Sequence, residues 1–283
     1  MSAAHTQGPA EVHERAFAKL NLVLHVGRPR RDGLHPICSI FASLDLADEL
    51  HARPGDVDRV ECEGVDGPNL AAAAVAAVRA EVPSLRPLDV RIEKRIPVAA
   101  GLGGGSADAA AALRAANRIA GEPLDAARLR AIAATLGSDV PSQVEPGHAL
   151  VSGTGEVVEP VGLPPLPVVL VPQARGLSTA EVYGHLDRTE GWRDRLDLDE
   201  VRAVLDADPS TWEISFQNDL QPAALALRPE LAAVTDGLRA AGALAAGVTG
   251  SGPTCFGLFA ERPIAEATAG AIPGALVTSL RER

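Results

Sequence analysis

The sequence has few cysteines and no long apolar segment, and each of these features argues against certain classes of protein. Its three cysteines, Cys38, Cys62 and Cys255, are an odd number without the spacing of metal ligands, so neither a disulfide framework nor a cysteine-based metal site is expected. The most apolar run, residues 161–171, is too short and too rich in proline to cross a membrane, and the first residues lack the apolar core of a secretion signal. We therefore expect reduced thiols in a cytoplasmic protein.

Positive charge is also limited. The chain has 26 lysines and arginines against 37 aspartates and glutamates, for a formal net charge of −11. This surplus of negative charge disfavours non-specific binding to nucleic acid or to an anionic membrane. A polyanionic ligand would therefore need a local positive site. The length of 283 residues and the hydrophobic content of 46% are sufficient for two domains with proper cores.

Lysine is the scarcest charged residue. The chain has only two lysines, Lys19 and Lys94, but 24 arginines. Arginine cannot imitate the compact, tunable ammonium of lysine, so both positions are candidates for a site. Lys19 lies in a predicted strand that begins at Phe17, where alternate leucines form one face and Lys19 and Asn21 share the other. That polar face is either an exposed edge, as is usual for lysine, or part of a site.

A glycine-rich stretch lies between a predicted strand and a predicted helix. Residues 97–110 read PVAAGLGGGSADAA, with four glycines in five positions. Alternation of apolar and polar residues predicts a half-buried strand over residues 88–93, and the alanine-rich run predicts a helix over residues 107–120. The glycines, Gly104 among them, can adopt positive φ and turn their N–H groups inward, and Ser106 can cap the helix.

Spacing separates this stretch from two other phosphate-binding loops. The dinucleotide pattern G-x-G-x-x-G fails because its last glycine would fall on Ser106 or Asp108, and no Lys-Ser or Lys-Thr pair follows as in a Walker loop. What remains is an anion site made of loop amides and the positive end of a helix dipole. A flexible surface loop before a helix stays open as the alternative.

Five segments together resemble the galacto-, homoserine, mevalonate and phosphomevalonate (GHMP) kinase superfamily. They are residues 18–22 (AKLNL), 32–35 (DGLH), 97–110, 137–141 (GSDVP) and 250–252 (GSG). The first two segments look like one family within it, whose members phosphorylate a cytidine diphosphate derivative of a small alcohol in the non-mevalonate isoprenoid precursor pathway. The resemblance covers nearly the whole chain.

The resemblance implies a two-domain α+β fold with the active site in the cleft between the domains. Residues 1–163 would form the N-terminal ATP-binding domain with the phosphate loop, and residues 164–283 a smaller C-terminal α/β-sandwich domain. The proline-rich residues 160–167 would be the hinge. It also implies ATP and Mg²⁺ as cofactors, a small-molecule alcohol as substrate, and a monomer or homodimer that binds neither nucleic acid nor membrane.

The same resemblance implies roles for individual residues. Asp139 would be the base that takes the proton of the acceptor hydroxyl, and Lys19 would orient it. The nucleotide would be bound by Asn69, Lys94, Pro97, Gly101, Gly103, Gly104, Gly105 and Ser106, with Ser106 also a ligand of Mg²⁺. The acceptor would be bound by Asn21, Leu34, His35, Tyr183, Gly250, Ser251 and Gly252.

Local structural roles compete with several of these assignments. Asn69 is a favoured helix N-cap, and an aspartate before a proline, like Asp139, is a common turn former. Tyr183 is the only tyrosine and could simply be a packing residue. For these positions the residues alone leave both interpretations open.

Three departures from the family pattern bear on the acceptor. Leu34 replaces the usual tyrosine, Pro36 the common glutamate, and Ser142 the usual phenylalanine. They favour, as an alternative, a kinase of the same superfamily that acts on a different alcohol. A catalytically silent nucleotide-binding protein is the other alternative. The presence of Ser106 together with the catalytic pair named above argues against silence.

Overall fold

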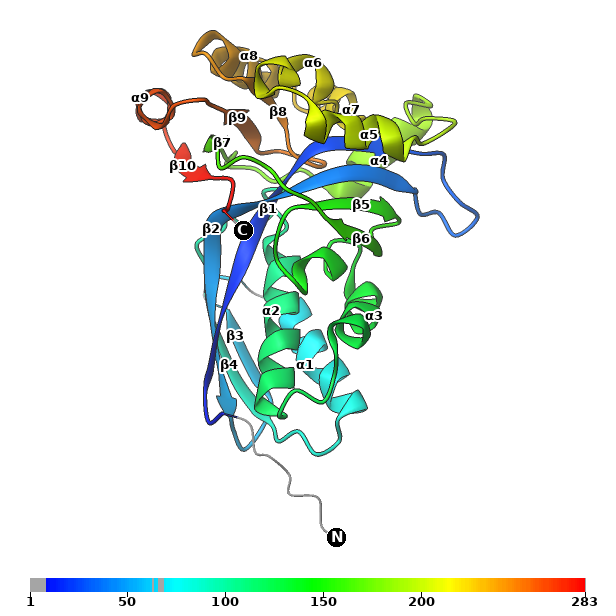
Figure 1. The fold of residues 1–283 in the computed structure, drawn as a ribbon, viewed down its shortest axis with the longest axis vertical. Helices are drawn as coiled ribbons and strands as arrows, with labels where there is room; N and C mark the ends of the chain where they lie inside the picture. The colour runs from blue at the N-terminus through cyan, green and yellow to red at the C-terminus, as the bar shows by residue number, and fades with distance from the viewer. Residues whose placement is uncertain (1–8, 63, 66–68, 283) are drawn as a thin grey trace. The chain divides into compact units, whose positions relative to one another are not determined.

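The computed structural model describes residues 9–62, 64–65 and 69–282, and their contacts group the chain into two compact units (Figure 1). Strands β1 (Val12–Val26) and β2 (Ile37–Pro54) contribute residues to both units. Unit 1 takes the described residues of 1–18, 47–98 and 104–146, and unit 2 takes those of 19–46, 99–103 and 147–283. The domain boundary at residue 163, a position inside unit 2, stays a prediction.

Unit 1 is built from strands and three α-helices. Besides its parts of β1 and β2, its elements are β3 (Arg59–Cys62), β4 (Leu88–Glu93), α1 (Leu70–Glu81), α2 (Gly104–Ile119), α3 (Ala126–Leu136) and the 3₁₀ turn η1 (Pro141–Gln143). β4 pairs antiparallel with residues 49–54 of β2 and parallel with β3. The predicted strand over residues 88–93 is confirmed, with Leu88, Val90 and Ile92 buried.

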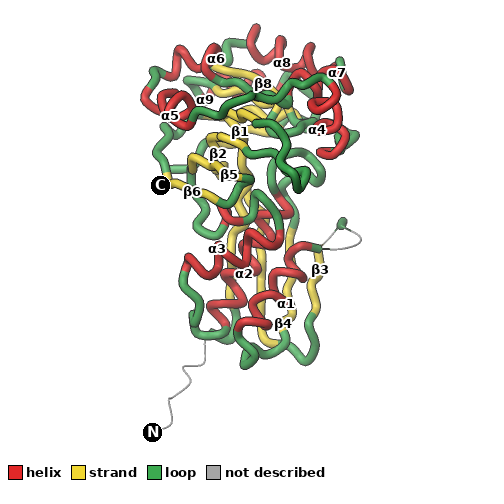
Figure 2. The backbone as a smooth tube through the Cα atoms, turned by 90° about the vertical axis from the view of Figure 1, so that its right-hand side faces the viewer, coloured by secondary structure: helices red, strands yellow, loops and turns green. Residues whose placement is uncertain are grey.

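Alanine lets the helices of unit 1 pack closely. α2 buries Ala107 and the run 109–112, and α1 buries Ala71 and Ala74. Because alanine carries only a methyl group, helices with alanines on their facing sides can approach each other closely. Figures 1 and 2 show α1, α2 and α3 on one side of β3 and β4. The buried side of α2 is part of the core between these layers. The first turn of α2 contains part of the glycine stretch.

Local capping signals set most helix ends in unit 1. The Asn69 side chain accepts a backbone hydrogen bond at 2.8 Å from two residues later, which confirms the predicted N-cap. Gly137 ends α3. The predicted cap at Ser106 is wrong, because α2 begins at Gly104 and Ser106 lies inside its first turn. The helix starts there because Gly103, with φ of +70°, interrupts the helical backbone.

Unit 2 contains a four-stranded sheet and a second group of strands. Besides its parts of β1 and β2, its elements are β5 (Ala149–Gly153), β6 (Val157–Pro160), β7 (Pro167–Val171), α4 (Thr179–Arg188), α5 (Leu198–Asp206), η2 (Pro209–Thr211), α6 (Trp212–Ser215), α7 (Gln221–Leu227), α8 (Glu230–Ala240), β8 (Ala245–Val248), β9 (Cys255–Leu258), α9 (Arg262–Gly270) and β10 (Leu276–Ser279). The four strands run in the order β10-β7-β9-β8, and α8 and α9 pack against them. β5 pairs antiparallel with residues 37–41 of β2 and with β6.

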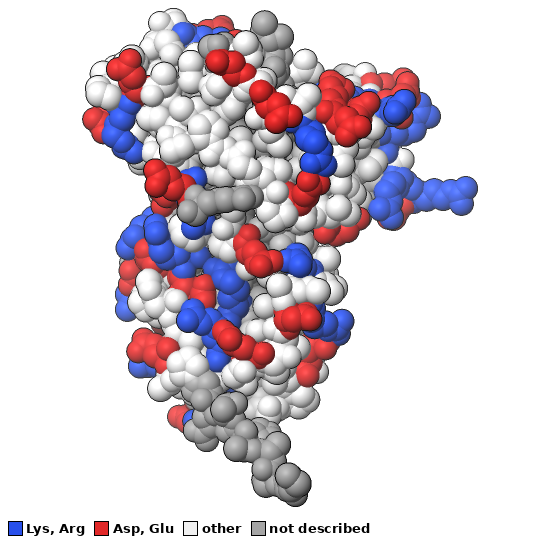
Figure 3. Space-filling view, in the orientation of Figure 1, with Lys and Arg blue, Asp and Glu red and all other residues white. Residues whose placement is uncertain are grey.

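Charged side chains of both signs are interspersed on the surface shown in Figure 3. The loop between β1 and β2 carries the exposed residues Arg28, Arg30 and Arg31. The guanidinium of Arg28 lies 4.4 Å from the centre of the Trp192 ring. Among the described residues no helix is both long enough and apolar enough to cross a membrane.

Candidate active site

The glycine stretch turns at two residues that only glycine fits. Gly101 and Gly103 have φ of +76° and +70°. A Cβ on Gly101 would lie 2.7 Å from the carbonyl oxygen of Gly252, and a Cβ on Gly103 would lie 2.9 Å from Cγ of Lys19. Real Cβ atoms do not make contacts that short, so both positions need glycine for the backbone angle and for space. Within unit 2 this part of the stretch therefore lies against Lys19 and against the loop after β8.

The second part of the stretch opens α2. The first N–H groups of a helix have no partner inside it, and the helix dipole makes that end positive, so anions bind there. A Cβ on Gly105 would have no described atom within 4 Å, whereas one on Gly104 would meet Ile96 Cγ2 at 3.1 Å and Lys94 Nζ at 3.3 Å. The expected positive φ at Gly104 is wrong, because that residue is helical. The open side of this helix end is at Gly105.

Lys94 is held by two buried carboxylates. Its Nζ donates to Asp48 Oδ2 at 2.5 Å and to Asp108 Oδ2 at 2.7 Å. Asp48 is fully buried and its other oxygen accepts from two backbone N–H groups. Burial by itself lowers the pKa of Lys94, but the carboxylates of Asp108 and Asp48 outweigh burial and the pKa is raised. The ammonium is therefore charged and fixed in position.

Asp108 is the least satisfied member of this cluster. It is 3% exposed, and its Oδ1 has no hydrogen-bond partner among the described residues. Burial raises the pKa of Asp108 to about 7, although the Lys94 ammonium opposes that change. The sequence pattern singled out neither Asp48 nor Asp108. The only available clue was an acidic residue inside a helix that is otherwise mostly alanine.

Replacement of Asp108 by asparagine should flatten the pH dependence of stability. The folded pKa of about 7 lies above the ordinary value of 3.8, so between these values the folded protein holds a proton that the unfolded chain releases. The stability that this group contributes is complete below pH 3.8 and is lost as the pH rises through 7.

The slope due to one such carboxyl is at most about 1.4 kcal/mol per pH unit. Urea unfolding of wild type and Asp108→Asn at several pH values between 4 and 8 measures it. The free energy of unfolding should fall with pH more steeply in the wild type than in the variant. Parallel curves would contradict the raised pKa.

Asp139 lies in the turn between α3 and η1 in unit 1 and is half-buried. Its carbonyl oxygen accepts a hydrogen bond from Ser142 Oγ at 2.8 Å, and Ser142 is buried. Arg114 of α2 donates to the carbonyl oxygen of Gln143 at 2.7 Å and to Glu14 Oε2 at 2.8 Å. Ser142, which departs from the family pattern, thus stabilises the turn. η1 therefore holds the backbone of Asp139 through Ser142, and Arg114 of α2 holds the end of η1.

Lys19 and Asn21 lie buried on β1 in unit 2. They are 5% and 3% exposed, so the interpretation of their face as an exposed edge is wrong. Lys19 Nζ donates to Asn21 Oδ1 at 2.6 Å and lies 4.7 Å from the centre of the Phe41 ring. The backbone N–H of Lys19 donates to the carbonyl oxygen of Leu102 at 3.0 Å, which joins β1 to the glycine stretch. A buried ammonium beside this loop can bind an anion through charge-assisted hydrogen bonds.

The loop between β8 and β9 is shaped by one asparagine. Nδ2 of Asn218 donates to the carbonyl oxygens of Val248 and Gly250, both at 2.8 Å. Gly250 and Gly252 have positive φ, and Ser251 is buried. The loop joins two neighbouring strands, because β8 pairs antiparallel with β9. Because Asn218 bonds to the end of β8 and to the first glycine of the loop, it restricts the path of the chain as it leaves β8.

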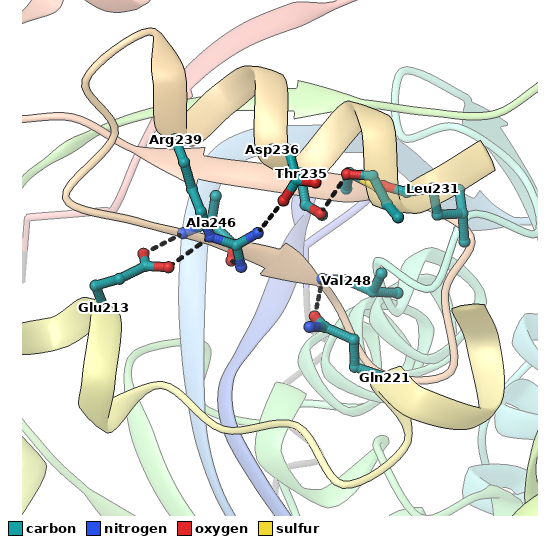
Figure 4. A network of polar contacts seen from close by, with 10 residues as sticks. Glu213, Gln221, Leu231, Thr235, Asp236, Arg239, Ala246 and Val248 are labelled. Carbon is teal, nitrogen blue, oxygen red and sulfur yellow. Dashed lines mark hydrogen bonds and ion pairs between the residues drawn. The ribbon is translucent and has the colours of Figure 1, made fainter. Parts of the chain in front are cut away.

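Side chains also cap the outer edge of β8 (Figure 4). Arg239 of α8 donates to the carbonyl oxygen of Ala246 at 2.7 Å, Glu213 accepts from Ala246 N at 3.3 Å, and Gln221 Oε1 accepts from Val248 N at 2.8 Å. An uncapped edge strand presents N–H and C=O groups that can pair with another chain. The capping keeps β8 in place and fixes the start of the loop that follows it.

His35 and Tyr183 meet in unit 2, with ring centroids 5.1 Å apart. Nδ1 of the buried His35 is 2.8 Å from the carbonyl oxygen of Gly27, and because a carbonyl only accepts, this nitrogen donates. Nε2 of His35 lies 3.3 Å from Asp187 Oδ1, and Leu34 is 50% exposed. Asp187 lies one turn after Tyr183 on α4, and no sequence signal marked it.

The predicted site residues therefore fall into two described groups. In unit 1 are Asn69, Lys94, Pro97, Gly104, Gly105, Ser106 and Asp139. In unit 2 are Lys19, Asn21, Leu34, His35, Gly101, Gly103, Tyr183, Gly250, Ser251 and Gly252. Lys94 lies beside Gly104 in the first group, and Lys19 lies beside Asn21 and Gly103 in the second.

Comparisons with known proteins decide the family. Residues 69–147 match the protein family described as "GHMP kinases N terminal domain", and residues 197–276 match the family described as "GHMP kinases C terminal". The 4-diphosphocytidyl-2-C-methyl-D-erythritol kinase of Salinispora arenicola (strain CNS-205) is 44% identical, over 93% of this chain and 87% of that protein. The chain belongs to the GHMP kinase family. As a GHMP kinase it is an ATP-dependent phosphotransferase, and the predicted two-domain α+β fold is confirmed.

Other relatives of this GHMP kinase agree. A 4-diphosphocytidyl-2-C-methyl-D-erythritol kinase of Anaeromyxobacter sp. (strain Fw109-5) is 44% identical, over 87% of this chain and 82% of that protein. A crystal structure of 4-(cytidine 5'-diphospho)-2C-methyl-D-erythritol kinase matches with a TM-score of 0.83 and 34% identity, over 96% of this chain and all of that one. The mevalonate kinase of L. major matches with a TM-score of 0.73 at 16% identity, covering 99% of both chains, which shows a shared fold alone.

Proposed function

We propose that this GHMP kinase transfers the γ-phosphoryl group of ATP to the 2-hydroxyl of 4-diphosphocytidyl-2-C-methyl-D-erythritol, a step in non-mevalonate isoprenoid precursor synthesis. The observation that carries the substrate is the 44% identity, over 93% of the chain, to a kinase of that name. The reaction class is supported independently by the glycine stretch at the start of α2 and by Lys94, which two buried carboxylates hold beside it.

ATP binds with its phosphates at the glycine stretch. The free N–H groups of the first turn of α2 hold phosphate oxygens, and Gly105 leaves room for them. Lys94, fixed by its two carboxylates, and Pro97 contact the nucleotide from the segment just before the stretch. Asn69 contacts the adenosine in addition to capping α1.

Phosphoryl transfer needs positioning and charge stabilisation more than covalent chemistry. Asp139 accepts the proton of the 2-hydroxyl as that oxygen forms a bond to the γ-phosphorus. The bond between the γ-phosphorus and the bridging oxygen breaks at the same time, and ADP leaves with that oxygen. Lys19 stabilises the negative charge that develops on the transferred group.

The described residues fit an Mg²⁺ ion that binds mainly through the phosphates of ATP. No group of three or more His, Cys, Asp or Glu side chains among the described residues can hold a metal ion. Mg²⁺ commonly keeps its waters and binds through substrate phosphates and one or two protein oxygens. The hydroxyl of Ser106, half-buried in the first turn of α2, is such an oxygen. When bound, Mg²⁺ neutralises charge on the phosphates, and Ser106 would hold it there.

The acceptor binds to residues of unit 2. The cytosine ring packs between Tyr183 and Leu34, and His35 hydrogen-bonds its edge. Asn21 and the loop 250–252 contact the polar remainder of the substrate near Lys19. A leucine in place of an aromatic ring supplies an apolar wall without stacking, so the acceptor binds more weakly than it would between two rings.

A coupled assay of ADP release tests the proposal. The purified protein with ATP and Mg²⁺ should turn over the cytidine substrate with a kcat/KM at least about 100-fold above that for mevalonate, homoserine or galactose, because a site built for polar partners rejects analogues that lack them. ADP release with one of the other alcohols alone would favour the second candidate, a kinase of this family for a different alcohol.

Leu34→Tyr should distinguish these two candidates further. A second stacked ring contributes about 1–3 kcal/mol, so the KM for the cytidine substrate should fall about 5- to 150-fold with little change in kcat. The KM for ATP should not change and serves as the internal control. An unchanged acceptor KM would indicate that Leu34, which is 50% exposed, does not contact the base.

A further inference from the structure

The side chain of Ser39, on β2, contacts the side chain of Asn21, which is a predicted substrate-binding residue. The serine is fully buried, with an exposed fraction of 0%. Its Oγ lies 2.5 Å from the carbonyl oxygen of Val23 and 2.9 Å from Nδ2 of Asn21. All three residues belong to unit 2. Nothing in the sequence pattern had assigned Ser39 a role.

The hydroxyl of Ser39 can orient the amide of Asn21 because it has only one proton. The carbonyl oxygen of Val23 can only accept, so the serine proton is committed to it. Oγ of Ser39 therefore presents a lone pair to Asn21, and only the NH₂ side of that amide can satisfy it. The carbonyl side of the amide is left facing Nζ of Lys19, at 2.6 Å.

The opposite orientation of this amide is unfavourable at both ends. A rotated Asn21 side chain would place its NH₂ group against the Lys19 ammonium and its oxygen against a serine lone pair. The backbone that carries this side chain is also fixed, because the Asn21 N–H donates to Thr249 Oγ1 at 3.0 Å. A Cβ on Gly250 would lie only 3.1 Å from Oδ1 of Asn21.

We propose that Ser39 is a positioning residue that fixes the amide orientation of Asn21 and, through it, the position of the Lys19 ammonium. This inference rests on the proposed function, in which Lys19 stabilises the transferred phosphoryl group. Ser39 acts through Asn21 and needs no contact with the substrate or with ATP.

Ser43 provides a matched control on the same strand. It is also buried, at 1% exposed, and lies four residues further along β2, so its side chain points to the same face. Its Oγ has no hydrogen-bond partner among the described residues. Ser43→Ala therefore removes the same atom from the same kind of environment without touching the contact to Asn21.

The test compares Ser39→Ala and Ser43→Ala in the wild type and in an Asn21→Ala background. In the wild-type background Ser39→Ala should lower kcat about 10-fold, with the KM for ATP changed less than about 3-fold, while Ser43→Ala leaves kcat unchanged. In the Asn21→Ala background Ser39→Ala should change kcat less than about 2-fold, because its effect passes through the missing amide. Single-turnover measurements allow the rate of phosphoryl transfer to be determined even for slow variants.

Melting temperatures complete the double-mutant cycle. The loss in melting temperature caused by Ser39→Ala should be smaller in the Asn21→Ala background than in the wild type, since the two side chains share one hydrogen bond. The inference is overturned if Ser39→Ala lowers kcat by the same factor in both backgrounds, or if it leaves wild-type kcat unchanged. A wild-type protein that phosphorylates none of the alcohols overturns the proposed function instead, and this inference with it.

Discussion

Asp139→Asn should lower kcat by about 10²- to 10⁴-fold, the usual worth of a positioned general base. Asparagine has the same shape but cannot accept the proton of the acceptor hydroxyl. The backbone contact of this turn, from Ser142 Oγ to the carbonyl oxygen of residue 139, does not depend on the carboxylate. The fold and the affinity for ATP should therefore be retained. Steady-state kinetics and calorimetric titration with ATP measure the two quantities separately.

Asp125→Asn is the matched control for this variant. Asp125 caps the N-terminus of α3, whose C-terminal end leads into the Asp139 turn, and it accepts from the backbone N–H of Arg128 at 2.8 Å. Asparagine caps helices about as well as aspartate, so this change removes a carboxylate near the same helix at little cost. Its kcat should stay at the wild-type value. If Asp139→Asn also kept full turnover, Asp139 would be a turn former only.

Gly103→Ala should lower kcat/KM for ATP by about 100-fold. The new Cβ would lie 2.9 Å from Cγ and 3.1 Å from Cε of Lys19, so the lysine side chain must shift. A displacement of about 1 Å of a group that positions reactants can cost about 10²-fold in rate. The alanine must also adopt φ near +70°, which costs about 1 to 2 kcal/mol of stability. Melting curves and kinetics report the two effects.

Gly274→Ala separates backbone strain from displacement of Lys19. Gly274 has φ of +76°, close to that of Gly103, but a Cβ there would have no described atom within 4 Å. Both variants should therefore lose a similar amount of stability. Only Gly103→Ala should lose activity. Equal activity in the two variants would mean that the close approach of the glycine stretch to Lys19 has no part in phosphoryl transfer.

The fold elements that the sequence predicted well are those with local causes. The strand over residues 88–93 follows from its alternating pattern, and the cap at Asn69 follows from the preference of asparagine for that position. The predicted start of the helix after the glycine stretch was wrong because of a neighbouring backbone angle. The start of α2 at Gly104 depends on the positive φ of the preceding residue, and several glycines in a row leave that position ambiguous.

Contacts between distant segments could not be predicted in the same way. Asp48 meets Lys94 because β2 pairs with β4 in a register that sets Glu49 opposite Glu93. One residue of slip in that register would move the carboxylate to the other face of the sheet. The local pattern of a single sequence does not specify the register between two distant strands.

What the sequence by itself determined is the glycine stretch between a strand and a helix, the scarcity of lysine around it, and the family resemblance that these residues carry. These features depend on residue type and short spacing, which need no folded context. Tertiary structure alone decided that Lys19 is buried, that one oxygen of Asp108 has no hydrogen-bond partner among the residues the structure describes, and that Ser39 accepts a hydrogen bond from the Asn21 amide. Burial and hydrogen-bond orientation arise only when separate strands and helices pack together, because each is a property of the neighbours and not of the residue.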